Sequence, residues 1–331
     1  MRAGGEDEMK KSNRKIVLMV LAIVLAAILC ACGSSEKDSG GEKGENKKEV
    51  KEEKKASGPS IEEEVLFEKD GVKVSVKGVE YMGTPADSAK VTFLVENQST
   101  ENLFFTDEAE IVNQYHAGYV SESGGKVPAG KQLDISMYIS AEELEELGYT
   151  VNEIGEVGIK LAAWNENNEF MWDTGLLCVK TSEYGKTGEG TVEAGTEIYN
   201  EEGVRIEYLG MTEDEAGYPA AELLFENTSD KDVICDIGSD FSAEADVKTY
   251  EEAKAAMEEQ IMAVPSSTPI VFSGKKRIEQ VMFSYYDVEK KIDPELLNEV
   301  NISIRLTENV TGNMMETPVL AESQTIVLQI K

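Results

Sequence analysis

The sequence predicts a mainly β protein with two tandem sandwich domains, preceded by a signal peptide and a flexible tether. Three observations support this prediction. Four sequence blocks recur in the same order in two halves of the chain, these blocks alternate apolar with polar residues, and an N-terminal apolar run ends at two cysteines. The 331 residues allow two domains.

The N-terminal segment has the pattern of a secretory signal. Met9 begins a basic stretch, and residues 16–29 are apolar without a charge. A membrane-spanning helix needs about 20 apolar residues, so this shorter run is typical of a signal peptide. Because residues 1–8 are acidic, we expect translation to start at Met9. An uncleaved anchor helix is the alternative.

The apolar run ends in Leu29, Cys30, Ala31 and Cys32. This stretch resembles the lipobox of bacterial lipoproteins, in which an aliphatic residue and two small residues precede the lipidated cysteine, although Cys30 departs from the usual Ala or Ser. The resemblance implies a diacylglyceryl group on the Cys32 sulfur and cleavage after a signal peptide of residues 1–31. It also implies that the lipid bilayer is a partner and that the body lies outside the cytoplasmic membrane.

The segment after Cys32 has the composition of a flexible linker, which we place at 32–60. Residues 33–60 contain seven basic and seven acidic side chains and no aromatic residue. Such a segment buries too little apolar surface to offset its chain entropy. A flexible chain of this length spans about 30 Å, enough to hold a folded body off the lipid surface. A short helix within it is the alternative.

The remainder of the chain is strongly acidic. Residues 58–331 hold 20 Lys and Arg against 54 Asp and Glu. This charge argues against nucleic acid as a partner, because nucleic-acid binding depends on basic side chains that neutralise phosphates. Cations and basic partners would be attracted. Solubility alone is the alternative explanation of the charge.

The body is duplicated, with domain 1 over 61–185 and domain 2 over 192–331. In each half, a strand-like opening is followed by an apolar run ending in Glu-Asn, a Gly-Lys turn and a final apolar run. The matching blocks are 71–76 with 203–208, 90–105 with 221–235, 127–139 with 271–283, and 153–161 with 298–306.

Each repeat is expected to be built mainly of strands. Val72, Val74 and Val76 alternate with polar residues, which is the period of a strand with one buried face. Asp70-Gly71 is among the turn signals that separate the strands. Ser140 begins a short helix as a capping residue, with Glu143 three positions later and a glycine as the stop. The equivalent helix in domain 2 is expected to begin at Asp293.

Domain 2 carries an insertion that predicts a further helix at about 249–264. Ala253, Ala256, Met257 and Ile261 fall on one helical face, and Pro265 ends the pattern. The plain interpretation is a helix that covers the sandwich. The alternative is a partner-binding helix with exposed Met257, Ile261 and Met262.

Short antiparallel strands joined by helical crossovers suggest immunoglobulin-like β-sandwiches. Each repeat also has a Gly-x-x-hydrophobic opening strand and an Asn-x-Ser turn, at Asn97 and Asn227. In these features the chain resembles the tandem immunoglobulin-like lipoproteins of Gram-positive bacteria. The resemblance implies a cell-surface location and carries over no functional residues, because that group has no generally established activity.

The sequence holds no catalytic signature, so we predict that the protein is not an enzyme. His116 is the only histidine, and no G-x-S-x-G motif occurs. Cys178 and Cys235 lie in apolar strand patterns and are expected to be buried, with a bridge between them as the alternative. No metal site or cofactor is predicted; Ca²⁺ on the acidic loops 106–110 or 212–217 is the alternative.

Aromatic residues give the candidate binding site. Trp164, Phe170 and Trp172 surround a polar turn and include both tryptophans of the chain. They could stack on a sugar ring or anchor a protein partner, or instead close the open end of the core. The predicted function is therefore a lipid-anchored, non-enzymatic binding or envelope-associated module. A Ca²⁺-dependent or carbohydrate-binding accessory protein is the alternative.

Overall fold

A computed structural model describes the following residues: 58–83, 86–117, 124–214, 216–239, 261–265, 269–285, 292–293, 297–309 and 317–330. Both repeats belong to one compact unit from Lys54 to Lys331. The predicted signal peptide, Cys32 and the tether up to residue 57 lie outside the described residues.

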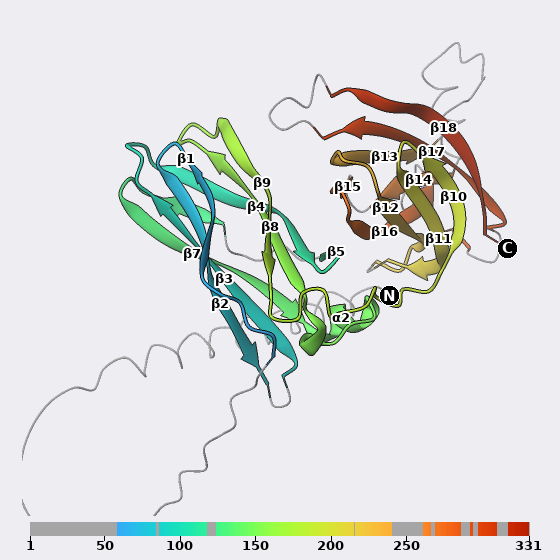
Figure 1. Ribbon diagram of the computed structural model, residues 1–331. Helices are drawn as coiled ribbons and strands as arrows, with labels where there is room; N and C mark the ends of the chain where they lie inside the picture. Colours follow the sequence, from blue (N-terminus) through green and yellow to red (C-terminus); the bar gives the residue numbers. More distant parts are fainter. Residues whose placement is uncertain are drawn as a thin grey trace, which may run out of the picture. The chain divides into compact units, whose positions relative to one another are not determined.

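Repeat 1 consists of two facing antiparallel sheets (Figure 1). The first sheet has the order β1 (Glu64–Lys69), β2 (Val72–Met82), β3 (Ser88–Asn97), β7 (Lys131–Ser140). In the second sheet, β4 pairs with three other strands, and one of these three pairs with β9 at the edge. Its strands are β4 (Leu103–Val112), β5 (Tyr115–Ala117), β6 (Gly125–Val127), β8 (Glu156–Trp164) and β9 (Phe170–Lys180).

Repeat 2 has the same two layers (Figure 1). One layer has the order β10 (Thr196–Glu201), β11 (Val204–Glu213), β12 (Pro219–Asn227), β16 (Lys276–Tyr285), with β14 (Ile261–Pro265) added beside β16. The pair β16–β5 makes this layer continuous with the second layer of repeat 1 in one ten-stranded sheet. The other layer of repeat 2 has the order β15 (Ile270–Val271), β13 (Val233–Ser239), β17 (Glu299–Glu308), β18 (Val319–Gln329).

The predicted mainly β fold class of tandem sandwiches is confirmed. In repeat 1, β3 pairs with β7 in one sheet, whereas the next strand along the chain, β4, pairs with β8 in the other. Repeat 2 repeats this arrangement with β12 beside β16 and β13 beside β17. Successive strands in different sheets, closed by long-range pairs, are the arrangement of immunoglobulin sandwiches.

The opening hairpins of the two repeats have the same backbone conformation. Asp70 and Gly71 have φ of 51° and 80°, and Glu202 and Gly203 have 52° and 78°. Positive φ at both central residues defines the type I′ turn, whose twist suits a two-residue hairpin. The Asp-Gly turn predicted from the sequence is therefore confirmed, and it is duplicated.

The short helix predicted after Ser140 is α2 (Ala141–Glu146). The Ser140 Oγ accepts from the Glu143 backbone N–H at 3.1 Å, and the Glu143 carboxylate accepts from the Ser140 N–H at 3.0 Å. These reciprocal bonds form the expected capping box. A single 3₁₀ turn, η1 (Val151–Glu153), follows before β8.

The helix predicted over 249–264 is wrong at its C-terminal end. Ile261 to Pro265 form β14, which pairs antiparallel with β16 from Tyr285 to Val281. Ala263 is buried and Ile261 packs on the repeat 2 core, so tertiary pairing overrides the local helical pattern. Residues 249–260 and 294–296 lie outside the described residues. The helix predicted over 293–300 is wrong at its C-terminal end, because Glu299 and Val300 begin β17.

Each sandwich encloses its own hydrophobic core. The repeat 1 core includes Phe93, Phe105, Ile135, Met137 and Ile159. The repeat 2 core includes Phe225, Cys235, Phe283, Ile304 and Leu306. Side chains that alternate along each strand supply these cores, as the period-two pattern predicts. No helix among the described residues is long and apolar enough to cross a membrane.

The two repeats also touch within the compact unit. Tyr115 on β5 pairs in parallel with Lys276 on β16, whose backbone N–H donates to the Gln114 carbonyl at 2.7 Å. Phe272 packs in a small cluster with Ile111, and its ring stacks on His116 with centroids 6.4 Å apart.

Candidate functional site

Four side chains form a row across the outer face of one sheet of repeat 1. Lys126 on β6 lies opposite Phe104 on β4, Phe104 lies opposite Trp164 on β8, and Trp164 lies opposite Phe170 on β9. The residues on either side of Phe104 are buried in the core, so the row points away from it. We call Lys126, Phe104, Trp164 and Phe170 the aromatic row.

The side chains of the aromatic row are held in place by one another and by their neighbours. The Trp164 indole N–H donates to Thr106 Oγ1 at 3.1 Å, and the Trp164 and Phe170 rings meet edge-to-face with centroids 5.4 Å apart. The Lys126 ammonium lies 5.6 Å from the Phe104 ring centroid. These contacts fix the rings before any ligand arrives, which lowers the entropic cost of binding.

A hydrogen-bonded turn joins the two strands beside the aromatic row. The Asn165 side-chain oxygen accepts the backbone N–H groups of Asn167 and Glu169 at 2.9 and 3.0 Å. The Glu166 carboxylate accepts from Lys126 Nζ at 2.6 Å and from the Asn102 amide at 3.0 Å. Because these bonds favour the ionised carboxylate, the pKa of Glu166 is lowered, the hydrogen bond from Lys126 being the largest cause.

Repeat 2 has no aromatic residue at the corresponding positions. Ile234 follows the first residue of β13, as Phe104 follows that of β4. Strand pairing aligns Ile234 with Ile270, Thr307 and, through Thr307, Val319. The same sandwich therefore forms with two isoleucines, a threonine and a valine in place of the aromatic row. Folding of this sheet does not require the aromatic and basic side chains of repeat 1.

Of the three aromatic residues proposed from the sequence, the structure brings together only Trp164 and Phe170. Trp172 is 8% exposed and packs in the core, with its ring 5.2 Å from Phe67 and 6.0 Å from Phe105 between centroids. A bulge explains the separation: Trp164 pairs with Phe170, whereas Ala163 pairs with Trp172. Trp172 is thus a core residue and does not belong to the candidate site.

Phe104 and Lys126 were missed by the sequence reasoning. The signal for Phe104 is its place between two inward-facing residues in Leu103-Phe104-Phe105, where strand alternation predicts an outward ring. Lys126 lies in a three-residue strand, which is too short to show any period.

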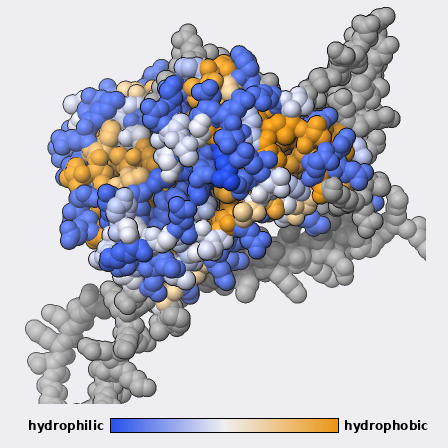
Figure 2. All heavy atoms as spheres, turned by 45° about the vertical axis from the view of Figure 1, so that its right-hand side comes forward, coloured by the Kyte–Doolittle hydropathy of each residue, from blue (hydrophilic) through white to orange (hydrophobic). Residues whose placement is uncertain are grey.

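Other apolar side chains also reach the surface. Figure 2 shows one face on which hydrophobic residues gather in separate patches bordered by hydrophilic ones. Scattered exposed hydrophobic residues are ordinary, so exposure alone does not define a site. Besides Phe104 of the aromatic row, the large apolar residues with exposed side chains are Val65, Met82, Tyr138, Met171, Tyr184, Met211, Val319 and Val327.

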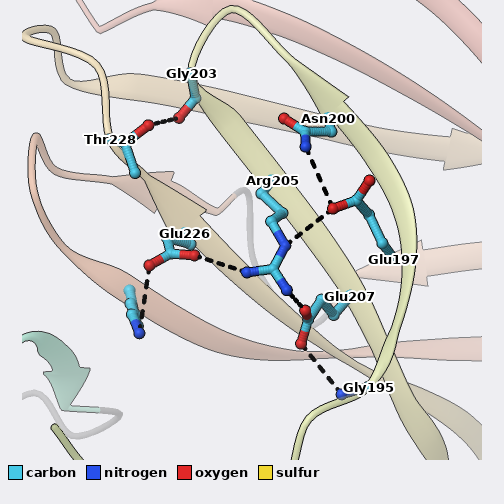
Figure 3. Close-up of polar contacts among 9 residues, drawn as sticks. Gly195, Glu197, Asn200, Gly203, Arg205, Glu207, Glu226 and Thr228 are labelled. Carbon is cyan, nitrogen blue, oxygen red and sulfur yellow. Dashed lines mark hydrogen bonds and ion pairs between the residues drawn. The ribbon is translucent and has the colours of Figure 1, made fainter.

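A charged cluster lies on the outer face of the first sheet of repeat 2 (Figure 3). Arg205 is surrounded by Glu197 at 3.0 Å from its Nε, Glu226 at 3.1 Å from Nη1, and Glu207 at Nη2. Glu207 also accepts from the Gly195 backbone N–H at 3.1 Å. Every nitrogen of the guanidinium therefore has a carboxylate partner, so the cluster cross-links strands and offers no anion site.

A second ion pair faces the interior of repeat 2. Arg277 Nη2 lies 2.8 Å from the Glu279 carboxylate, whose side chain is 4% exposed. The corresponding positions of repeat 1 are Leu133 and the buried Ile135. Arg277 and Glu279 alternate along β16 in step with the core residues Val281 and Phe283, so all four lie on the same side of the sheet. This alternation is the sequence signal for the ion pair. Pairing offsets the cost of burying both charges.

The two cysteines of the body differ in their surroundings and form no disulfide. Cys235 is buried, and this burial raises the pKa of its thiol to about 12. Cys178 is exposed, which corrects the expectation that it is buried. The neighbours of Cys178 on β9, Leu177 and Val179, face the core, so strand alternation turns Cys178 outward.

Within the described residues, no three or more His, Cys, Asp or Glu side chains gather as metal ligands. No family model matches this chain, and no curated protein matches it in sequence. The kinds of group that the site can bind are therefore inferred from the chemistry of its own side chains. Aromatic faces attract cations and stack on flat groups, and the amide, ammonium and carboxylate beside them form hydrogen bonds.

Proposed function

We propose that this chain is a lipid-anchored extracytoplasmic protein whose sandwich domains form a non-enzymatic binding module. Cys32, at the end of the apolar run, carries the lipid, and the mixed-charge tether holds the domains away from the bilayer. Two acyl chains anchor a protein far more firmly than one. The proposed place is the outer side of the cytoplasmic membrane, at the bacterial cell surface.

The aromatic row is the observation that supports the binding function. Trp164 and Phe170 are held rigidly on an outer sheet face, and repeat 2 builds the same sheet without them. Aromatic side chains fixed at a surface are a frequent source of binding energy in protein interfaces. A protein or a glycan is the proposed partner class, and nucleic acid is disfavoured by the charge of the body.

The anchoring part of the proposal is tested by metabolic labelling. The full chain is produced in a bacterial host with radiolabelled palmitate, as the natural sequence and as the variants Cys32→Ala and Cys30→Ala. We expect label and membrane association for the natural sequence and for Cys30→Ala, and neither for Cys32→Ala. Label that persists in Cys32→Ala, or is absent from the natural sequence, would overturn the proposed anchor.

A further inference from the structure

One half of the aromatic row already binds a cation from the protein itself. The Lys126 ammonium lies between the Phe104 ring, 5.6 Å from its centroid, and the Glu166 carboxylate, at 2.6 Å. An ammonium placed over an aromatic face is attracted by the negative charge of that face. Lys126 therefore shows which kind of group this surface accommodates: a cation between a ring and a carboxylate.

The other half of the row has two aromatic rings without an internal cation. Within the described residues, no lysine or arginine lies over the ring of Trp164 or Phe170. The turn that joins these two residues carries Glu169, whose carboxylate accepts a hydrogen bond from the Asn165 side-chain amide at 2.7 Å. Glu166 of the same turn is already paired with Lys126. Glu169 thus precedes Phe170 directly in the chain, and its carboxylate is held by a hydrogen bond.

The negative charge of the body favours a positively charged ligand. With 54 acidic against 20 basic residues over 58–331, the protein attracts basic partners and repels polyanions. Among cationic side chains, arginine suits this surface best. Its planar guanidinium stacks on an aromatic face while its edge bonds a carboxylate with two parallel N–H groups, which the ammonium of lysine cannot do.

We propose that Trp164 and Phe170, with Glu169 beside them, form a docking site for an arginine side chain in a basic segment of a partner protein. This inference rests on the proposed function as a binding module and names its ligand class. The arginine takes at Trp164 the place that Lys126 takes at Phe104. Surrounding acidic residues accelerate the encounter, and ionic strength weakens it.

The test uses the fragment Lys54–Lys331, which contains both hydrophobic cores. The variant Trp172→Phe leaves Trp164 as the only tryptophan, so that its fluorescence reports on the aromatic row. The probe is a Gly-Ser peptide of ten residues with three arginines, and a peptide with three lysines is its charge-matched control. We expect a saturable change in Trp164 fluorescence, with the arginine peptide binding at least threefold more tightly than the lysine peptide.

Two substitutions separate a local site from general attraction, with labelled arginine peptide as the probe. Trp164→Ala should weaken binding at least tenfold, and Glu169→Gln at least threefold. Glu145→Gln removes the same charge from an exposed position of helix α2. This helix precedes β8, whereas the turn that carries Glu169 follows β8. This control should change the affinity by less than twofold. Equal losses for Glu169→Gln and Glu145→Gln would mean diffuse electrostatic binding and overturn the docking site.

A neutral oligosaccharide of N-acetylglucosamine is titrated in parallel. If it perturbs Trp164 and the arginine peptide does not, the ligand class is wrong although the binding module stands. If neither probe binds, the arginine site is overturned, whereas palmitate labelling of Cys32 tests the anchor independently.

Discussion

Asn97 and Asn227 perform the same task in the two repeats. Asn97 Nδ2 donates to the carbonyls of Glu101 and Val127, both at 2.8 Å. Asn227 Nδ2 donates to the carbonyls of Lys231 and Val271 at 2.7 and 2.8 Å. Both side chains are buried, so each ties a turn to a neighbouring strand where water does not compete.

Replacing either asparagine should destabilise its own repeat. Asn97→Ala and Asn227→Ala each remove one buried and one part-buried hydrogen bond to a carbonyl group, and we expect each to lower the free energy of unfolding by about 2–3 kcal/mol. Urea denaturation of Lys54–Lys331 measures the loss. Ser99→Ala, which removes one hydroxyl from the same turn, should cost about 1 kcal/mol or less. Losses for the asparagine variants no larger than for Ser99→Ala would contradict the shared role.

The turn and the helix start were predictable because they depend on local chemistry. Asp70-Gly71 specifies a type I′ turn through its positive φ values, and Ser140 with Glu143 specifies a helix start. Both signals lie within a few residues of the structure that they determine. The strand periods likewise follow directly from the alternation of apolar and polar residues.

The features that sequence reasoning missed depend on contacts between distant residues. Phe170 and Trp172 are two positions apart, so alternation places them on one face; the bulge opposite β8 places them on opposite faces. Ile261 continues a helical pattern, yet its segment forms a strand because β16 offers an edge. The candidate site is therefore half predicted: Trp164 and Phe170 were identified, whereas Phe104 and Lys126 join them only through strand pairing.

Trp172 provides a direct test of the division between core and surface. Trp172→Ala leaves a cavity beside Phe67 and Phe105, and we expect it to lower the free energy of unfolding by about 3–5 kcal/mol. Trp164→Ala removes an outward ring and should cost about 1 kcal/mol. Thermal and urea unfolding of both variants, at equal concentration, provide the comparison. A larger loss for Trp164→Ala than for Trp172→Ala would place the wrong ring in the core.

The Arg205 cluster predicts a difference between the repeats. Arg205→Ala removes the cationic partner of the Glu207 carboxylate, which is 6% exposed, and among the described residues leaves it the Gly195 N–H. Because Arg205 itself is partly exposed and water screens the charges, we expect a loss of about 1–2 kcal/mol. Lys73→Ala in repeat 1 removes a single pair with Glu96 at 2.7 Å and should cost less. Unfolding free energies at low and high salt check both, and equal losses would contradict a special role for Glu207.

His116 should make the free energy of unfolding depend on pH. Burial, followed by the positive charge of Arg277, lowers the pKa of His116 from 6.5 to about 3. The unfolded chain then binds a proton that the folded chain does not, so stability is complete above pH 6.5 and falls as the pH drops toward 3. Between pH 7.5 and 5.5 we expect a loss of about 1.4 kcal/mol that the variant His116→Gln lacks.

Urea unfolding of Lys54–Lys331 and its His116→Gln variant at both pH values measures this difference. The carboxylates are common to the two proteins, so their contribution cancels in the comparison. His116 meets Phe272 of repeat 2, and that contact helps to exclude water from the imidazole. Phe272→Ala should therefore reduce the pH-dependent loss. An identical pH profile for the unsubstituted fragment and His116→Gln would show that the imidazole is hydrated and that the two repeats do not shield it.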